Sequence, residues 1–164
     1  LTDNIDEFVV KTLAKYKDKE FKSVSADDLG LENSEKQEEI KAKEEENSGM
    51  LDELAKALEG KVTKVILSHR LKSHPVCLTS EGEISLEMEK VLNSMPTDQK
   101  IHAQRVLEIN PEHQIFDKLK SISEAGDSEK LGKYAQLLYT QALLIEGMSI
   151  ENPVEFSNLI CELM

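Results

Sequence analysis

The chain has 164 residues, with 20 Lys and Arg against 32 Asp and Glu, and a formal net charge of -12. This acidity argues against a nucleic-acid partner, because phosphate binding requires clustered Lys and Arg side chains. The length is sufficient for one domain with a hydrophobic core, or for one domain plus a fragment of another. Aromatic residues make up 4% and tryptophan is absent, so the core must consist mainly of aliphatic residues and Met.

Targeting signals and disulfide patterns are missing from the sequence. No apolar run is long enough to cross a bilayer and no secretory signal is visible, so we expect no membrane partner. Cys77 and Cys161 lie far apart and indicate no disulfide framework, which favours a cytoplasmic location and small buried thiols. The chain begins with Leu1 in place of Met, and we expect it to be a piece of a longer protein.

Residues 1–30 predict one helix and one strand. Apolar residues recur at helical spacing, namely Ile5, Phe8, Val9 and Leu13, with Asp3 or Asn4 as the N-cap. The stretch "EFKSVS" at residues 20–25 is typical of a strand. A single helix and strand cannot enclose a core, so we expect residues 1–30 to be the tail of a preceding domain.

Residues 31–47 are almost entirely charged or polar, with Ile40 as the main apolar exception. Such a composition predicts a charged linker or an exposed helix. An acidic tail that binds a partner is the alternative.

Residues 48–164 predict an α+β domain with a small mixed three-stranded sheet packed with helices. A helix with Ser48 as its cap ends before Gly60. β-Branched residues then predict a hairpin-like strand pair, Val62–Leu71 and Pro75–Thr79, and a third strand at Gln104–Ile109.

A short helix is expected at Ile84–Met95, ended by Pro96. One face carries an apolar stripe, consisting of Ile84, Met88, Val91, Leu92 and Met95. Glu87, Glu89, Lys90 and Asn93 lie off this stripe. A stripe at helical spacing usually faces the core, whereas flexible Met side chains suit a surface that meets varied partners. The residues alone leave both interpretations open.

Three helices follow the third strand. The pairs Asn110–Pro111 and Asn152–Pro153 predict the starts of the first and the last, with Asn as N-cap and Pro at the first helical position. Between them a long helix at Glu129–Glu146 is apolar on more than one side, so it needs cover from two directions. The last helix can cover one side, and a second copy of the chain can cover the other. We therefore expect a homodimer whose C-terminal helical hairpins form an intermolecular four-helix bundle. The expected interface residues are Tyr134, Leu137, Leu138, Leu144, Ile145, Phe156, Leu159, Ile160 and Leu163.

No pattern of catalytic residues is present in the sequence. Nucleophile-elbow and phosphate-loop motifs are absent, and the one pair of histidines close to a turn, His69 and His74, lacks the usual metal-ligand spacing. We expect no catalytic residue, metal or cofactor. The alternative, a hydrolase or metalloenzyme, would require a polar cluster that only folding brings together.

Four stretches, in order along the chain, resemble the C-terminal part of the 90-kDa heat-shock-protein chaperones, most closely the bacterial members. They are "NIDEFVVKTLAKYKDKEFKSVS", "VTKVILSHRLKSHPVCLTS", "VLEINPEHQIFDKL" and "LLYTQALLIEGMSIENPVEF". The resemblance implies that residues 1–30 end a middle domain and that residues 48–164 form a C-terminal dimerisation domain. The end "LICELM" differs from the Met-Glu-Glu-Val-Asp tail of the eukaryotic cytosolic members.

The resemblance also implies a function. The parent protein would be an ATP-dependent chaperone whose ATP and Mg²⁺ are bound by an N-terminal domain that this chain lacks, so the chain itself would not be an enzyme. Its partners would be a second copy and non-native client proteins. The helix at Ile84–Met95 maps onto a helix implicated in client contact, which makes its apolar stripe the expected client-binding surface. A plain dimerising adaptor without client binding is the alternative.

Overall fold

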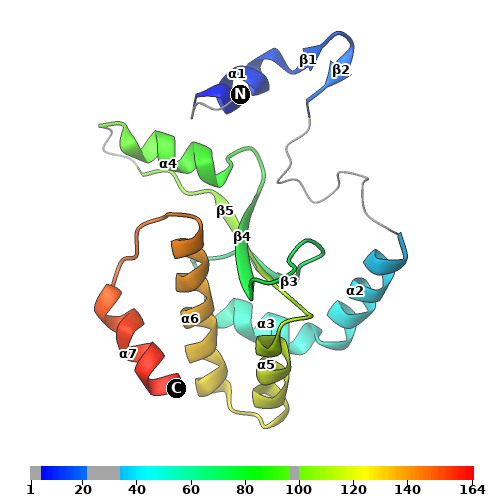
Figure 1. Cartoon of the computed structure of the whole chain (residues 1–164). Helices are drawn as coiled ribbons and strands as arrows, with labels where there is room; N and C mark the ends of the chain where they lie inside the picture. Colours follow the sequence, from blue (N-terminus) through cyan, green and yellow to red (C-terminus); the bar gives the residue numbers. More distant parts are fainter. Residues whose placement is uncertain (1–4, 22–33, 97–99) are drawn as a thin grey trace. The chain divides into compact units, whose positions relative to one another are not determined.

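The computed structural model describes residues 5–21, 34–96 and 100–164 of the chain. Within these ranges it combines helices with a small mixed sheet, which confirms the predicted α+β fold (Figure 1). In chain order the elements are α1 (Asp6–Leu13), β1 (Lys15–Tyr16), β2 (Lys19–Glu20), α2 (Ser34–Glu46), α3 (Ser48–Ala57), β3 (Lys64–Leu67), β4 (Val76–Glu81), α4 (Leu86–Ser94), β5 (Gln104–Ile109), α5 (Gln114–Glu124), α6 (Ser128–Ile145) and α7 (Pro153–Leu163).

The chain divides into two compact units that are interleaved in sequence. The smaller unit comprises residues 1–32 and 79–104, and the larger unit comprises residues 33–78 and 105–164. The division passes through β4 and β5. The domain boundaries expected after residues 30 and 47 stay predictions about the longer protein.

The sheet has the strand order β3-β5-β4, so the predicted hairpin of Val62–Leu71 with Pro75–Thr79 is wrong. β3 instead pairs in parallel with β5, from Lys64 opposite Val106 to Leu67 opposite Ile109. Residues 106–110 are all buried, and a strand buried on both faces belongs at the centre of a sheet. β5, the last of the three strands in the chain, therefore lies between β3 and β4, which follow each other in sequence. The expected strand at residues 20–25 lies largely outside the described residues.

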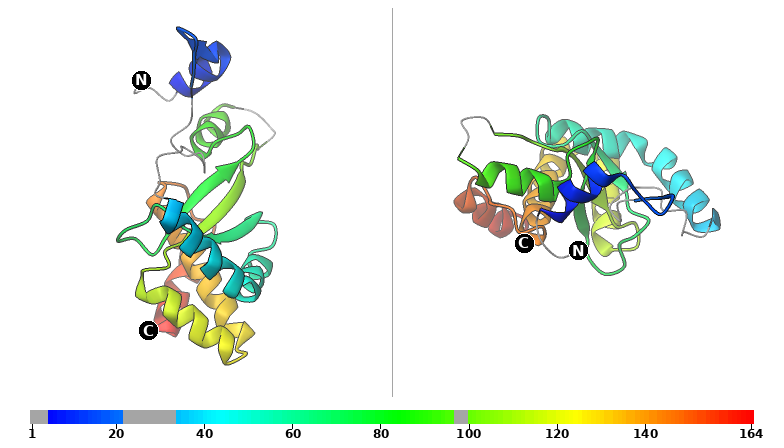
Figure 2. Two further views of the ribbon diagram at one scale, coloured as in Figure 1. Left: turned by 90° about the vertical axis from the view of Figure 1, so that its right-hand side faces the viewer. Right: turned by 90° about the horizontal axis from the view of Figure 1, so that it is seen from above.

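Helices and β3 form the core of the larger unit. α3, α5 and α6 contact one another, and α3 also contacts β3 (Figure 2). The least exposed side chains in this core are Leu54, Leu58, Leu67, Leu107, Ile109, Leu119 and Leu131. Within the segment expected to be a linker or an exposed helix, α2 is a helix that contacts β3 and buries Ile40. Glu44 fixes it, because its Oε1 accepts a hydrogen bond of 2.7 Å from the backbone N–H of Leu67.

The Asn110–Pro111 pair does not start a helix, which corrects the prediction. α5 begins at Gln114 and is capped by His113. Asn110 is fully buried, and its Nδ2 donates to the carbonyl oxygen of His74 at 3.0 Å while its Oδ1 accepts from the N–H of Glu112 at 2.9 Å. Asn110 therefore connects the end of β5 to the segment before β4.

At two other helix starts one predicted cap is confirmed and one is wrong. Asn152 caps α7 as predicted, since its Oδ1 accepts from the N–H of Glu155 at 3.1 Å and Pro153 occupies the first turn. The predicted cap Ser48 instead lies inside α3, which follows Asn47. Asn47 is buried and bonds back to the preceding helix, so α3 begins one residue earlier than the sequence indicated.

A buried carboxylate lies in the central strand. Glu108 accepts hydrogen bonds of 2.7 Å from Ser68 Oγ and from Arg70 Nη2, which compensate for its removal from water. Cys77 is half-buried on the neighbouring strand β4. Burial first, and then the negative charge of Glu108, raise the pKa of the Cys77 thiol to about 12.

The two cysteines should therefore differ in reactivity. A thiol must ionise to react, so Cys77 should stay protonated and unreactive at pH 8, whereas Cys161 is exposed. We expect iodoacetamide to label native Cys161 at least about tenfold faster than Cys77, since one pKa unit changes the thiolate fraction about tenfold. Mass spectrometry of timed samples measures both rates, and unfolding in urea should equalise them. Equal rates in the native protein would contradict the burial of Cys77.

Candidate functional site

The helix α4 forms because Ser85 and Pro96 delimit it. Ser85 has an extended backbone, and its Oγ accepts a hydrogen bond of 3.1 Å from the N–H of Met88, which satisfies one of the free donors of the first turn. Met95 returns to an extended backbone before Pro96. The helix predicted at Ile84–Met95 is thus present with bounds Leu86–Ser94, slightly shorter because Ser85 is its cap.

The buried face of α4 is not its apolar stripe. Leu86 and Glu89 are buried, at 7% and 2% exposure, and the spacing of three residues places them on one face. The predicted client-binding residues lie away from this face. Ile84, Met88, Val91 and Leu92 are half-buried, and Met95 is 50% exposed. The stripe is therefore only partly covered by the chain itself, and its role in client binding stays a prediction.

Polar bonds hold the inward face of α4. Glu89 Oε2 accepts a hydrogen bond of 2.9 Å from the N–H of Ala103, and Glu89 Oε1 lies 3.4 Å from His102 Nδ1. Asn93 bonds twice to the backbone of Ile101, donating through Nδ2 at 2.8 Å and accepting through Oδ1 at 2.9 Å. These contacts tie the helix to the residues that lead into β5. The sequence pattern assigned no role to Glu89, and its spacing from Leu86 is the one signal that could have indicated burial.

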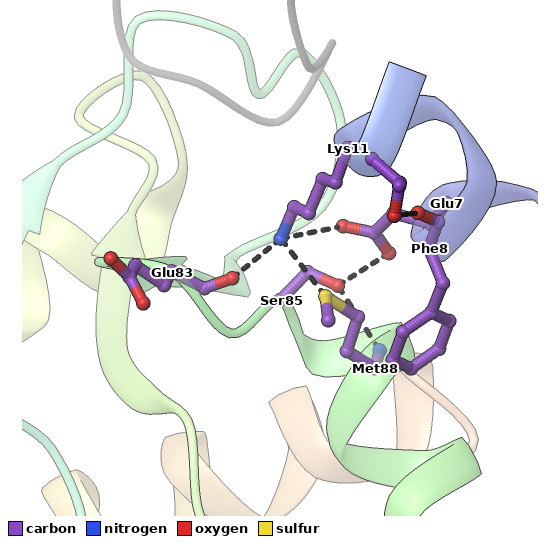
Figure 3. Close-up of polar contacts among 7 residues, drawn as sticks. Glu7, Phe8, Lys11, Glu83, Ser85 and Met88 are labelled. Carbon is purple, nitrogen blue, oxygen red and sulfur yellow. Dashed lines mark hydrogen bonds and ion pairs between the residues drawn. The ribbon is translucent and has the colours of Figure 1, made fainter. Parts of the chain in front are cut away.

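The helix α1 meets the first turn of α4 within the same unit. Lys11 Nζ donates to the carbonyl oxygen of Glu83 and lies 2.9 Å from Met88 Sδ. Glu7 Oε2 accepts a hydrogen bond of 2.6 Å from Ser85 Oγ (Figure 3).

Glu7 and Phe8 of α1 also lie close to Lys11 and Met88. Glu7 also pairs with Lys11 at 3.3 Å, and Phe8 points toward Met88 in Figure 3. Ionic, aromatic and thioether groups from two helices thus lie side by side. Because the two helices are more than 70 positions apart in the chain, local sequence patterns could not bring them together.

The predicted dimer interface lies on α6 and α7 in the larger unit. Tyr134 and Leu138 are buried by the chain itself, whereas Leu144, at 47% exposure, and Ile145, at 45%, are open. On α7 Ile160 is exposed, and Phe156, Leu159, Leu163 and, on α6, Leu137 are half-buried. No residue of α7 is buried, and its Val154, which the sequence did not single out, is 69% exposed.

An ion pair network connects α7 to α6. Lys133 Nζ on α6 bonds to Glu162 on α7 and lies 2.9 Å from Glu129 one turn earlier. The hydrogen bonds to these two carboxylates raise the pKa of Lys133, so it is charged at neutral pH. This contact fixes the helical hairpin from its polar side and leaves the apolar side of α7 uncovered.

Other candidate residues are dispersed. Within residues 5–21, 34–96 and 100–164, no group of three or more His, Cys, Asp or Glu side chains could hold a metal ion. His74 offers its carbonyl oxygen to Asn110, and Cys161 is exposed in the single chain, which corrects its expected burial. No helix in the described part of the chain is both long and apolar enough to cross a membrane.

Comparisons with known proteins identify the family of the chain. Residues 1–164 match the protein family described as Hsp90 protein. The chain is 56% identical over its whole length to the chaperone protein HtpG of Alkaliphilus oremlandii. It is 55% and 51% identical over 99% of its length to the chaperone proteins HtpG of Clostridium botulinum and Bacillus subtilis. In each case it spans 26% of the relative's length. The chain belongs to the Hsp90 family.

Proposed function

We propose that this chain is the C-terminal homodimerisation region of an ATP-dependent chaperone, and that its α4 surface contacts non-native client proteins. The absence of any buried residue on α7, although the helix carries Phe156, Leu159, Ile160 and Leu163, is the observation that carries the proposal. An amphipathic helix is stabilised mainly by burial of its apolar face against a neighbour. A second copy of the chain is the partner that supplies this neighbour with matching apolar residues.

The residues on α6 and α7 divide between fold and interface. Tyr134 and Leu138 are buried within one chain, so they stabilise the protomer. Leu144, Ile145 and Ile160 are exposed, so they are available to the partner and to a four-helix bundle. Obligate homodimer interfaces are core-like and often bury more than about 2,000 Å² in total, which aliphatic side chains of this kind would supply.

The client surface is supported by the mixed character of α1 and α4. Met88 and Met95 are flexible and polarisable, so they can adapt to different apolar segments. Lys11 beside Met88, and Glu7 which pairs with Lys11, can bond to the backbone or to charged groups of an extended client. An adaptor without client binding would share the dimer but would not use this surface.

The family membership supports the remaining properties proposed for the parent protein. ATP and Mg²⁺ would be bound by an N-terminal domain outside this chain, which would therefore have no ATPase activity of its own. A reducing cytoplasm suits the two free cysteines.

Leu→Ala at two positions on α6 should separate the stability of the protomer from the strength of dimerisation. Leu138→Ala should lower the free energy of unfolding by about 2–5 kcal/mol, because it leaves a cavity in the protomer. Leu144→Ala should leave protomer stability nearly unchanged and weaken dimerisation by about 1–2 kcal/mol at each copy, or tenfold or more in Kd. Chemical denaturation and sedimentation velocity over a concentration series measure the two effects. A concentration-independent monomer for the unmutated chain would refute the dimer.

Charge placed on the stripe should impair chaperone function without unfolding the domain. In the full-length protein, Met88→Asp with Met95→Asp should preserve the circular dichroism spectrum and weaken suppression of client aggregation, because a carboxylate opposes apolar contact. Ser94→Asp is the matched control, since Ser94 is exposed on α4 and lies off the stripe. Loss of folding in the double variant would show that the stripe is core. Undiminished suppression would exclude it as the client surface.

A further inference from the structure

The amphipathic pattern of α4 is inverted relative to the usual surface helix. The face opposite the stripe carries Glu89 at 2% exposure beside one buried apolar residue, Leu86, and Asn93 lies one turn later on the same side, where it is exposed. The apolar stripe points elsewhere and stays partly open, with Met95 half exposed. Burial of apolar area alone would favour a rotation of the helix that turns the stripe inward. Specific polar bonds must therefore oppose that rotation.

Glu89 supplies the stronger of these bonds. A buried carboxylate is costly unless it is bonded, and here both of its oxygens face partners just before β5. Oε2 accepts from the N–H of Ala103, and Oε1 faces His102 Nδ1. Turning the stripe inward would break this bond and leave the N–H of Ala103 without its acceptor.

Asn93 adds a bond of a different kind. Its side-chain amide both donates to and accepts from the backbone of Ile101, as a neighbouring strand would. Glu89 and Asn93 are four residues apart, so they lie on the same face of the helix. Together they fix three consecutive residues, 101–103, to one side of α4.

We propose that Glu89 and Asn93 are positioning residues that set the rotation of α4 and so keep its apolar stripe outward. They act through the helix and need not touch a client. Buried polar bonds can select one packing arrangement over a more apolar competitor, as polar residues do in helical interfaces. The orientation can be tested independently, but its purpose rests on the proposed client surface.

The first experiment measures the orientation directly. Met95→Cys is introduced into the full-length protein with Cys161→Ser, and peptide mass spectrometry reads labelling at residue 95, while Cys77 is masked by its raised pKa. Glu89→Ala and Asn93→Ala should each slow labelling of this thiol by up to about fivefold, because one net hydrogen bond shifts the equilibrium between the outward and inward orientations by about that factor. Glu89→Gln keeps an acceptor for Ala103 and should label nearly as the parent does.

Glu87→Ala is the matched control on the same helix. Glu87 is exposed and pairs with Lys90, so its removal takes away a charge without touching residues 101–103. Labelling that is unchanged or faster in folded Glu89→Ala and Asn93→Ala would overturn the proposal, because it would mean that the bonds do not hold the stripe outward. If Glu89→Ala fails to fold, Asn93→Ala decides the test alone. Asn93 is exposed, so its loss leaves no buried cavity and the variant should fold.

The second experiment uses reduced, carboxymethylated α-lactalbumin as a permanently unfolded probe. Its affinity for the full-length protein should fall by up to about fivefold in Glu89→Ala and Asn93→Ala, and stay at the parent value in Glu87→Ala and Glu89→Gln. This result supports the positioning role in binding. Slower labelling with unchanged affinity would support the orientation mechanism and refute the client role of the stripe. The two proposals can therefore fail separately.

Discussion

Burial of β5 along residues 106–109 is the constraint on which much of the larger unit depends. A strand with both faces covered must lie between neighbours, so β3 and β4 take its two sides although they follow each other more closely in sequence. Glu108 lies within this strand and requires bonded partners. Ser68 and Arg70 supply them, which fixes the segment after β3 against the central strand. The charge at Glu108 also contributes to keeping Cys77 protonated.

Local patterns in the sequence predicted the helices well, because a spacing of three to four apolar residues and a cap are properties of neighbouring positions. The Asn152–Pro153 start shows this. The identical dipeptide at Asn110–Pro111 misled, because full burial of Asn110 directs its side chain to His74 and Glu112. Strand order could not be predicted for the same reason. It is set by which strand must be buried on both faces, and that depends on contacts far apart in the chain.

The sequence predicted which residues of the candidate surfaces are apolar. It could not predict which of these side chains the chain itself covers. Leu138 and Leu144 lie on the same helix and are chemically identical, yet one is buried by the chain and the other is 47% exposed. Which of them faces the protomer depends on where α3, α5 and α7 pack. On α4 the difference is greater, because Glu89 takes the inward position that an apolar residue would usually occupy. Phe8 and Lys11 were absent from the predicted surface because α1 is distant in sequence.

The proposed client surface on α4 and the proposed dimer surface on α6 and α7 would act together, although they lie in different units. A stripe of Met and aliphatic residues adapts to many partners and gives each only a weak contact, because ordering flexible side chains offsets part of the gain. Dimerisation through α6 and α7 would place two such stripes in one assembly. If one non-native chain touched both stripes of the proposed dimer, its second contact would form at the high effective concentration that the dimer creates. The gain in affinity requires no conformational signal between the surfaces, only that the protomers stay together. In the proposed dimer, an incompletely covered α7 and an outward-facing α4 would therefore be complementary: the first would join two weak sites in one assembly, and the second would keep each site available.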